Sequence, residues 1–230
     1  MLETVIGVDG CPGGWIAAIW RGDLIETKLV RRFSELLTIK AAVVAVDMPM
    51  GLPEKHGRLA EQLARRALTG RASSLFAIPS RAAVGALSYA EACAVNLKNS
   101  DPPRKLSKQT YHLFPKMREV DAILTPELQA RVFETHPELA FCAMNGFAAL
   151  KLSKKMREGQ SERLNLLALQ GMPKLEPSAF QHAAKDAQPD DIIDACAAAW
   201  SARRILEGRA RRFPETEERD ARGLLMRIHA

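Results

Sequence analysis

Two aspartates in the C-terminal part of the chain have the spacing of a catalytic carboxylate pair. Asp191 and Asp194 are three residues apart, at the start of an alanine-rich run that ends near Trp200. Residues three apart on an α-helix share a face, so both carboxylates are expected to point the same way. The small alanine side chains that follow would let such a helix pack closely against a sheet.

Two further aspartates, Asp9 and Asp47, each end an apolar run in the N-terminal part of the chain. Continuous apolar runs of this length are typical of buried central strands. Carboxylates at strand ends, together with a carboxylate pair on a late helix, can hold two Mg²⁺ or Mn²⁺ ions for phosphodiester hydrolysis. We therefore predict that all four aspartates ligate metal and take part in catalysis.

Each aspartate also has a structural explanation of its own. Asp9 precedes a turn rich in glycine and proline, and Asp47 can cap the turn after its strand. Asp191 suits the first turn of a helix because it complements the helix dipole, whereas Asp194 lies one turn further in. It is the combination of the four that favours a metal site. Oxygen ligands without a cysteine or histidine cluster favour Mg²⁺ or Mn²⁺ over zinc.

A third polar segment, Glu134 to Glu138, lies where a strand is expected to give way to a helix. Alternation along the strand places Glu134 and His136 on one face, and Glu138 falls in the first helical turn. These three residues join the catalytic candidates, with Glu138 ahead of Glu134 as a metal ligand or water-orienting group. His136 is a candidate proton shuttle, and a hydrogen-bonded structural histidine is an equal alternative.

The elements around these residues predict an α/β fold. The first three strands are joined by tight turns, which is the pattern of an antiparallel meander. The expected strands are residues 4–9, 15–20, 24–30, 41–46, 131–135 and 224–228. A helix is expected at 164–169 and a long helix at 190–208. We expect a single domain over residues 1–230, in which residues 50–130 form a helical insertion between the fourth and fifth strands.

Composition limits the classes of function. The 230 residues have a formal net charge of +6, which is compatible with a polyanionic partner. The cysteines lack paired spacing, so free thiols in a reducing compartment are expected rather than disulfides or zinc. Neither a leader nor an apolar run long enough to cross a bilayer is apparent, so we expect a cytoplasmic protein without a membrane partner. The four cysteines are Cys11, Cys93, Cys142 and Cys196.

Several short segments of the chain resemble those of a known family. Each segment alone is a weak signal, but the set of them together is specific. They are residues 7–15, 46–52, Arg71 with 73–76, 79–81, 107–109, 134–138, 153–155 and 190–195. Over nearly its whole length the chain resembles a bacterial and archaeal family of uncharacterised proteins predicted to be RNase H-like nucleases. The late helix is also similar to the last catalytic helix of RuvC-type Holliday-junction resolvases. The family usually has an aspartate in the helix after the fourth strand, where this chain has Glu61.

The resemblance implies an RNase H-like mixed sheet, with an antiparallel three-strand meander followed by parallel strands and flanking helices. It also implies that the four aspartates surround divalent metal. Arg81, Lys154 and Lys155 fall within the resembling segments and are our candidates for contacts to nucleic-acid phosphates. We expect a metal-dependent nuclease that acts on DNA or RNA. The sequence leaves open whether the protein forms a homodimer. The alternatives are a phosphotransferase of the actin and sugar-kinase type and a non-catalytic nucleic-acid-binding module.

Overall fold

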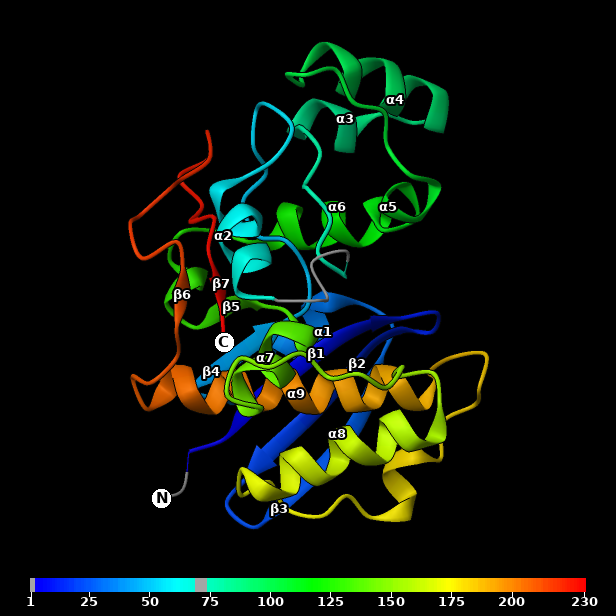
Figure 1. Ribbon diagram of the computed structural model, residues 1–230, viewed down its shortest axis with the longest axis vertical. Coiled ribbons are helices and arrows are strands. Elements are labelled where there is room, and N and C mark those ends of the chain that lie inside the picture. Colours follow the sequence, from blue (N-terminus) through cyan, green and yellow to red (C-terminus); the bar gives the residue numbers. More distant parts are fainter. Residues whose placement is uncertain (1–2, 69–73) are drawn as a thin grey trace.

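Seven strands form one mixed sheet within residues 3–68 and 74–230, the part of the chain that the computed structural model describes (Figure 1). The strand order is β3-β2-β1-β4-β5-β7-β6. The strands are β1 (Val5–Cys11), β2 (Gly14–Arg21), β3 (Leu24–Val30), β4 (Val43–Val46), β5 (Val132–Thr135), β6 (Arg212–Phe213) and β7 (Ile228–His229).

The first three strands pair antiparallel. Strand β4 then pairs parallel with β1, β5 pairs parallel with β4, and β7 pairs parallel with β5. The predicted α/β class, with a meander followed by parallel strands, is confirmed. The last strand is not where the sequence indicated, because Leu224 and Met226 form a local turn by bonding back to Asp220 and Glu218. Strand β7 therefore begins only at Ile228, and it pairs antiparallel with the unexpected short strand β6.

In the sequence, five α-helices of the described residues lie between β4 and β5, where the insertion was predicted. Of these, α3 and α4 lie at the end of the molecule farthest from β3 (Figure 1). That the whole chain is a single domain stays a prediction. No helix in the described ranges is long and apolar enough to cross a membrane. The helices are α1 (Phe33–Leu37), α2 (Leu59–Ala67), α3 (Arg81–Gly85), α4 (Tyr89–Lys98), α5 (Lys108–His112), α6 (Phe114–Ile123), α7 (Pro137–Met144), α8 (Arg157–Leu169) and α9 (Pro189–Leu206).

Helix α8 begins earlier than the apolar pattern at 164–169 indicated. Its buried positions are Gly159, Arg163 and Leu167, which are four residues apart and so share one face. Only the last of the three is a large apolar residue. The N-terminal half of the helix therefore carries no amphipathic signal, although it packs against the rest of the protein.

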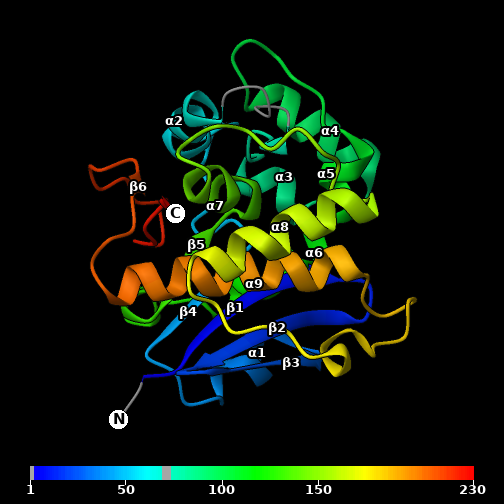
Figure 2. The same ribbon diagram turned by 60° about the horizontal axis from the view of Figure 1, so that its bottom comes forward.

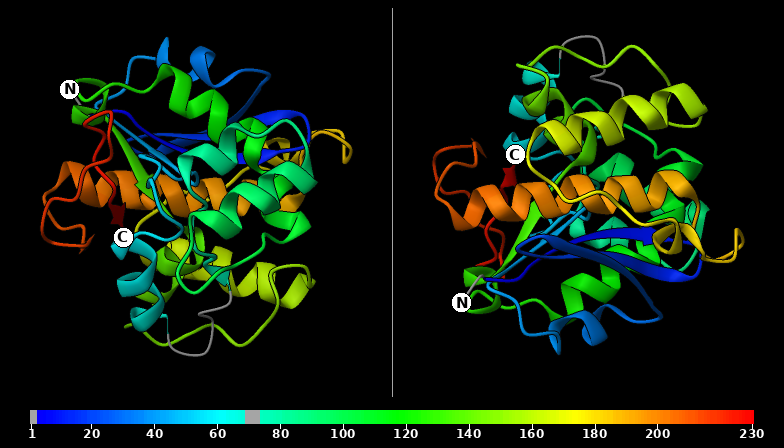
Figure 3. Two further views of the ribbon diagram at one scale, coloured as in Figure 1. Left: turned by 90° about the horizontal axis from the view of Figure 1, so that it is seen from above. Right: turned by 90° about the horizontal axis from the view of Figure 1, so that it is seen from below.

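Helices cover both faces of the sheet, and the alternation of side chains along β1 explains how (Figure 3). Ile6 and Val8 point to one face, where they join a core with Phe33 of α1 and Phe114 of α6. Val5 points to the other face, where the core is formed with α9. Helix α8 runs beside α9 on that side (Figure 2). The result is three layers with the sheet in the middle.

Helix α9 lies unusually close to β1 because Gly7 has no side chain. A Cβ atom at Gly7 would come within 1.9 Å of the Ala199 backbone nitrogen and 2.1 Å of the Ala195 carbonyl oxygen. Such distances are far inside van der Waals contact, so only glycine fits. This contact brings the N-terminal turns of α9, which carry Asp194, toward the end of β1 that carries Asp9.

Candidate functional site

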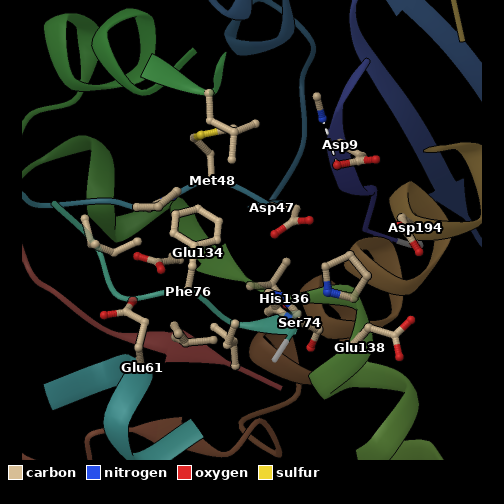
Figure 4. Close-up of a pocket in the computed structure, with 18 of the residues that line it drawn as sticks. Asp9, Asp47, Met48, Glu61, Ser74, Phe76, Glu134, His136, Glu138 and Asp194 are labelled. Carbon is tan, nitrogen blue, oxygen red and sulfur yellow. Dashed lines mark hydrogen bonds between the residues drawn. The ribbon is translucent and has the colours of Figure 1, made fainter. Parts of the chain in front are cut away.

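A cavity of about 340 Å³ opens at the carboxyl ends of β1, β4 and β5 (Figure 4). These strands run parallel, so the residues at their ends meet at one edge of the sheet. The backbone N–H of Asp47 donates to the Val8 carbonyl oxygen at 2.9 Å, which fixes the two strand ends side by side. Polar and charged residues that line the cavity include Asp9, Asp47, His136, Glu138, Lys154 and Asp194.

Three carboxyl groups from three different elements converge in this cavity. Asp9 comes from β1, Asp47 from the end of β4 and Asp194 from the second turn of α9. Burial, and then the charges of the other two carboxylates, raise the pKa of Asp9 well above its usual value. Burial also raises the pKa of Asp47 to about 7 and that of Asp194 to about 6. The cavity therefore opposes full ionisation of the three groups unless a cation compensates them.

The ammonium group of Lys154 places a positive charge inside the cavity. It donates a hydrogen bond to Asp194 Oδ2 and forms an ion pair with it. Burial alone would lower the pKa of Lys154, but the carboxylates of Asp194, Asp9 and Asp47 raise it above its usual value. Asp194 Oδ1 is buried and has no hydrogen-bond partner within the described residues. When ionised, the three aspartates and Lys154 together carry a net charge of −2.

The loop that carries Lys154 is held in place from two sides. A Cβ atom at Gly159 of α8 would lie 2.1 Å from the Ser153 carbonyl oxygen, so the loop packs directly on the helix backbone. Lys155 forms an ion pair with Asp190 in the first turn of α9, with an N–O distance of 2.5 Å. The two adjacent lysines thus bind two aspartates at the start of α9.

Glu134 has a different setting from the one expected for a metal ligand. Its Oε1 accepts from Arg58 at 2.5 Å, and its Oε2 accepts from Arg58 at 2.9 Å and from the Met50 backbone N–H at 2.7 Å. Arg58 is fully buried and also binds Glu61. Both carboxylate oxygens of Glu134 are therefore occupied, which supports a structural role in holding the segment after β4.

Glu138 and His136 lie closer to the three aspartates (Figure 4). Arg163 of α8 is fully buried and donates to Glu138 Oε1 at 2.8 Å, which orients this carboxylate. His136 Nδ1 is buried without a hydrogen-bond partner among the described residues. Burial lowers the pKa of His136, so the imidazole is neutral at pH 7 and can accept a proton.

Asp191 does not share the cavity with Asp194. Its Oδ2 accepts from the Gln188 backbone N–H at 2.8 Å, as part of a capping box at the start of α9. The expectation that both carboxylates of the pair point into one site therefore holds for Asp194 alone. The cause is local, because a carboxylate at the third helical position can reach back to the N-cap.

Two of the three candidates for phosphate contacts lie outside the cavity lining. Arg81 forms ion pairs with Asp121 at 2.7 Å and Asp220 at 2.5 Å, and Lys155 is bound to Asp190. Lys154 lies inside the cavity. Whether these residues contact nucleic acid stays a prediction, and Arg71 and Ser73 lie outside the described residues.

The donor atoms of the cavity fit a hard divalent cation by their chemistry, since they are carboxylate oxygens. Among the described residues, no group of three or more His, Cys, Asp or Glu side chains is already arranged to hold a metal ion. The unpartnered Asp194 Oδ1 is a free ligand atom, but Lys154 holds the other oxygen of that carboxylate. A metal at Asp194 would have to share this carboxylate with Lys154 or displace it.

The sequence did not predict roles for Arg58 and Arg163, and it predicted a different role for Lys154. Both arginines lie within polar stretches that resemble solvated helix faces, so no local pattern marks them as buried. Lys154 was expected to contact a phosphate, whereas the structure also makes it the partner of Asp194.

The chain belongs to a family described as Protein of unknown function (DUF429), whose model matches residues 7–219. The match includes Asp9, Asp47 and Asp194, together with Lys154. No significant match was found among curated proteins or among solved structures. The family description names no activity.

Proposed function

We propose that this protein is a divalent-metal-dependent phosphodiesterase of the RNase H-like class that acts on nucleic acid or its nucleotide components. The observation that carries the proposal is the convergence of Asp9, Asp47 and Asp194 in one cavity with Lys154. Their net charge of −2 when ionised equals the charge that one divalent cation neutralises. The sheet supports the RNase H-like class, since the order β3-β2-β1-β4-β5 begins with a meander and continues with parallel strands.

Asp9, Asp47 and Asp194 would hold the metal, which is Mg²⁺ or Mn²⁺ by the chemistry of the ligands. When bound, the ion would polarise a phosphoryl oxygen and lower the pKa of a water molecule. Arg163 holds Glu138 beside the ligands, where Glu138 completes the acidic side of the cavity. Arg58 binds the Glu134 carboxylate, so Glu134 is not free to hold the metal. Arg58 also binds the Met50 carbonyl oxygen and so fixes the segment that follows Asp47.

Two further side chains are placed for work on the substrate. Lys154 would turn its ammonium group from Asp194 to a phosphate oxygen, where a positive charge stabilises the charge that develops during hydrolysis. His136 is neutral and its Nδ1 has no hydrogen-bond partner among the described residues, so it can take the proton of the attacking water.

Cleavage assays with purified protein test the proposal. Single-stranded and double-stranded DNA and RNA oligonucleotides and bis(4-nitrophenyl) phosphate are incubated with Mg²⁺, Mn²⁺ or EDTA. We expect cleavage that requires metal and falls by about a hundredfold or more in Asp47→Asn. Asp23→Asn, in the turn between β2 and β3, is the matched control because Asp23 is exposed and lies outside the cavity lining.

Cleavage that survives EDTA, or that is equal in Asp47→Asn and in the control, would overturn the proposal. Transfer of phosphate from ATP to a small acceptor, without any diesterase activity, would instead support the phosphotransferase. Salt-sensitive binding of oligonucleotides without turnover would support the non-catalytic module.

A further inference from the structure

The cavity has two chemically different sides (Figure 4). One side carries the three aspartates. The other side carries apolar residues, which are Met48 after β4 and residues of the helical segment between β4 and β5. It also carries Glu61 and Glu134, whose carboxylates are paired with Arg58. Figure 4 shows Met48 and Phe76 on the side of the pocket away from Asp194. Apolar residues that line the cavity include Met48, Phe76, Ile78 and Leu113.

The apolar side is not fully covered by protein. Met48 and Ile78 are buried, whereas Phe76 is half-buried and packs only at the margin of the core formed with α1 and α6. A half-buried aromatic ring that lines a cavity is a surface on which another flat ring can stack. The adjacent Met48 adds a polarizable sulfur, which makes favourable contacts with aromatic rings.

The depth of the carboxylates limits which substrates reach them. Asp194 is 2% exposed and Asp9 is 8% exposed, whereas Asp47 is half-buried. A phosphodiester must therefore enter the cavity to approach them, and a base-paired duplex is too wide to do so without unpairing. The volume of about 340 Å³ is at the small end of the range for small-molecule sites, which is roughly 300–1,000 Å³.

The charges around the cavity also argue against a long polyanion. Among the described residues that line it, Lys154 is the single lysine or arginine. Arg81 and Lys155 are bound to acidic partners elsewhere. A groove that follows a nucleic-acid backbone needs several basic residues along its length.

We propose that the cavity binds one unstacked nucleotide, with its base against Phe76 and Met48 and its phosphate at the three aspartates. The substrate is then a nucleoside phosphodiester, either free or at a single-stranded position of a chain, and not an intact duplex. This inference rests on the proposed phosphodiesterase function for the position of the phosphate. The base site itself requires only the apolar side.

The base site is tested first without metal and without turnover, so that its failure is distinct from failure of the phosphodiesterase proposal. Binding of nucleosides, which lack phosphate, is measured by saturation-transfer NMR and titration on the metal-free protein. We expect binding by wild type and by Phe76→Tyr, which keeps the ring. Phe76→Ala should weaken it by about 5- to 100-fold, since loss of one base–aromatic stack has an effect of this size.

Phe180→Ala, a half-buried phenylalanine on the α9 side of the molecule, is the matched control. Thermal melts establish that each variant is folded. Nucleosides that do not bind wild type, or that bind Phe76→Ala and Phe180→Ala alike, would overturn the base site.

Turnover then tests the position of the phosphate and the source of the nucleotide. Thymidine 5′-(4-nitrophenyl) phosphate is compared with methyl 4-nitrophenyl phosphate, which has no base. Phe76→Ala should lower kcat/KM for the first by about 5- to 100-fold and leave the second within about twofold. Equal losses on both esters would overturn the inference.

The last experiment compares the cleavage of three oligonucleotides, which are a linear single strand, a circular single strand and a fully paired duplex. Cleavage of the linear single strand alone assigns the site to strand ends, and cleavage of the circle as well assigns it to any unpaired nucleotide. Turnover of the small ester alone assigns it to free nucleotides. A paired duplex without ends that is cleaved as fast as the single strand would overturn the inference.

Discussion

Lys154 and Asp194 form an ion pair inside the cavity, although they are 40 residues apart in the sequence. The lysine binds one oxygen of the carboxylate, and the other oxygen has no partner among the described residues. Lys154 thus supplies part of the positive charge that the carboxylates need in the absence of metal. The charges of the carboxylates and Lys154, together with the buried Arg58 and Arg163, determine how the protein should respond to mutation, pH and metal.

Lys154→Met removes the internal cation and keeps the length of the side chain. Because the ammonium group competes with a metal ion for Asp194, the variant should bind Mn²⁺ several-fold more tightly than wild type. Activity should nevertheless fall, since the phosphate contact is lost. Titration calorimetry with Mn²⁺ measures the affinity, with Lys155→Met as the control because Lys155 pairs with Asp190. Weaker Mn²⁺ binding in Lys154→Met would contradict the competition.

The stability of the metal-free protein should fall as pH rises from about 6.5 to 8. Below this window the lowered pKa values of the buried His136 and His229 act in the opposite direction. The folded-state pKa values of Asp47 and Asp194 are raised to about 7 and about 6 by burial, above those of the unfolded chain. Such groups favour the folded state at low pH, and this contribution is lost as pH rises through the folded values. Thermal melts in EDTA across this window measure the effect.

Asp47→Asn should flatten that pH profile, because an amide does not ionise. Added Mg²⁺ should restore stability at about pH 8, since it binds the ionised carboxylates of the folded state. A melting temperature of the EDTA-treated wild type that is constant or rises over the window would refute this assignment.

Asp194→Asn and Asp191→Ala should have opposite effects. Asp194→Asn keeps the size of a buried side chain but weakens metal binding, so metal-dependent cleavage should be lost in a protein of unchanged or slightly higher stability. Asp191→Ala removes a capping contact and should cost about 1 kcal/mol of unfolding free energy while activity survives. Urea denaturation and a cleavage assay on both variants separate the roles, and equal loss of activity in both would return Asp191 to the site.

Arg58→Met should destabilise the protein strongly. Its guanidinium is buried between Glu61 and Glu134, and removal of one partner leaves uncompensated buried charge, which typically costs about 3–5 kcal/mol. Adding Glu134→Gln to Arg58→Met should recover part of the loss. The unfolding free energies from urea titrations check this, and a loss below about 1 kcal/mol would mean that the pair is not buried in solution.

Local patterns in the sequence determined the fold class and the positions of Asp9 and Asp47. Both aspartates end continuous apolar runs that form central strands, and parallel strands place such ends at one edge of a sheet. The alanine-rich run after Asp194 predicted a helix that packs closely on the sheet, and Gly7 explains why it can. These features depend on neighbouring residues, so they are visible without a structure.

Only the tertiary structure decided which polar groups are free to act. Asp191 is held by a local cap at the start of α9, but Asp194 enters the cavity only because α9 packs against β1. Glu134 is bound by Arg58, which is 76 residues away in the sequence, and Lys154 is bound to Asp194. Partners so distant in the chain meet only when the sheet and its helices pack. Burial then sets the strength of each pairing and the pKa of each carboxyl group.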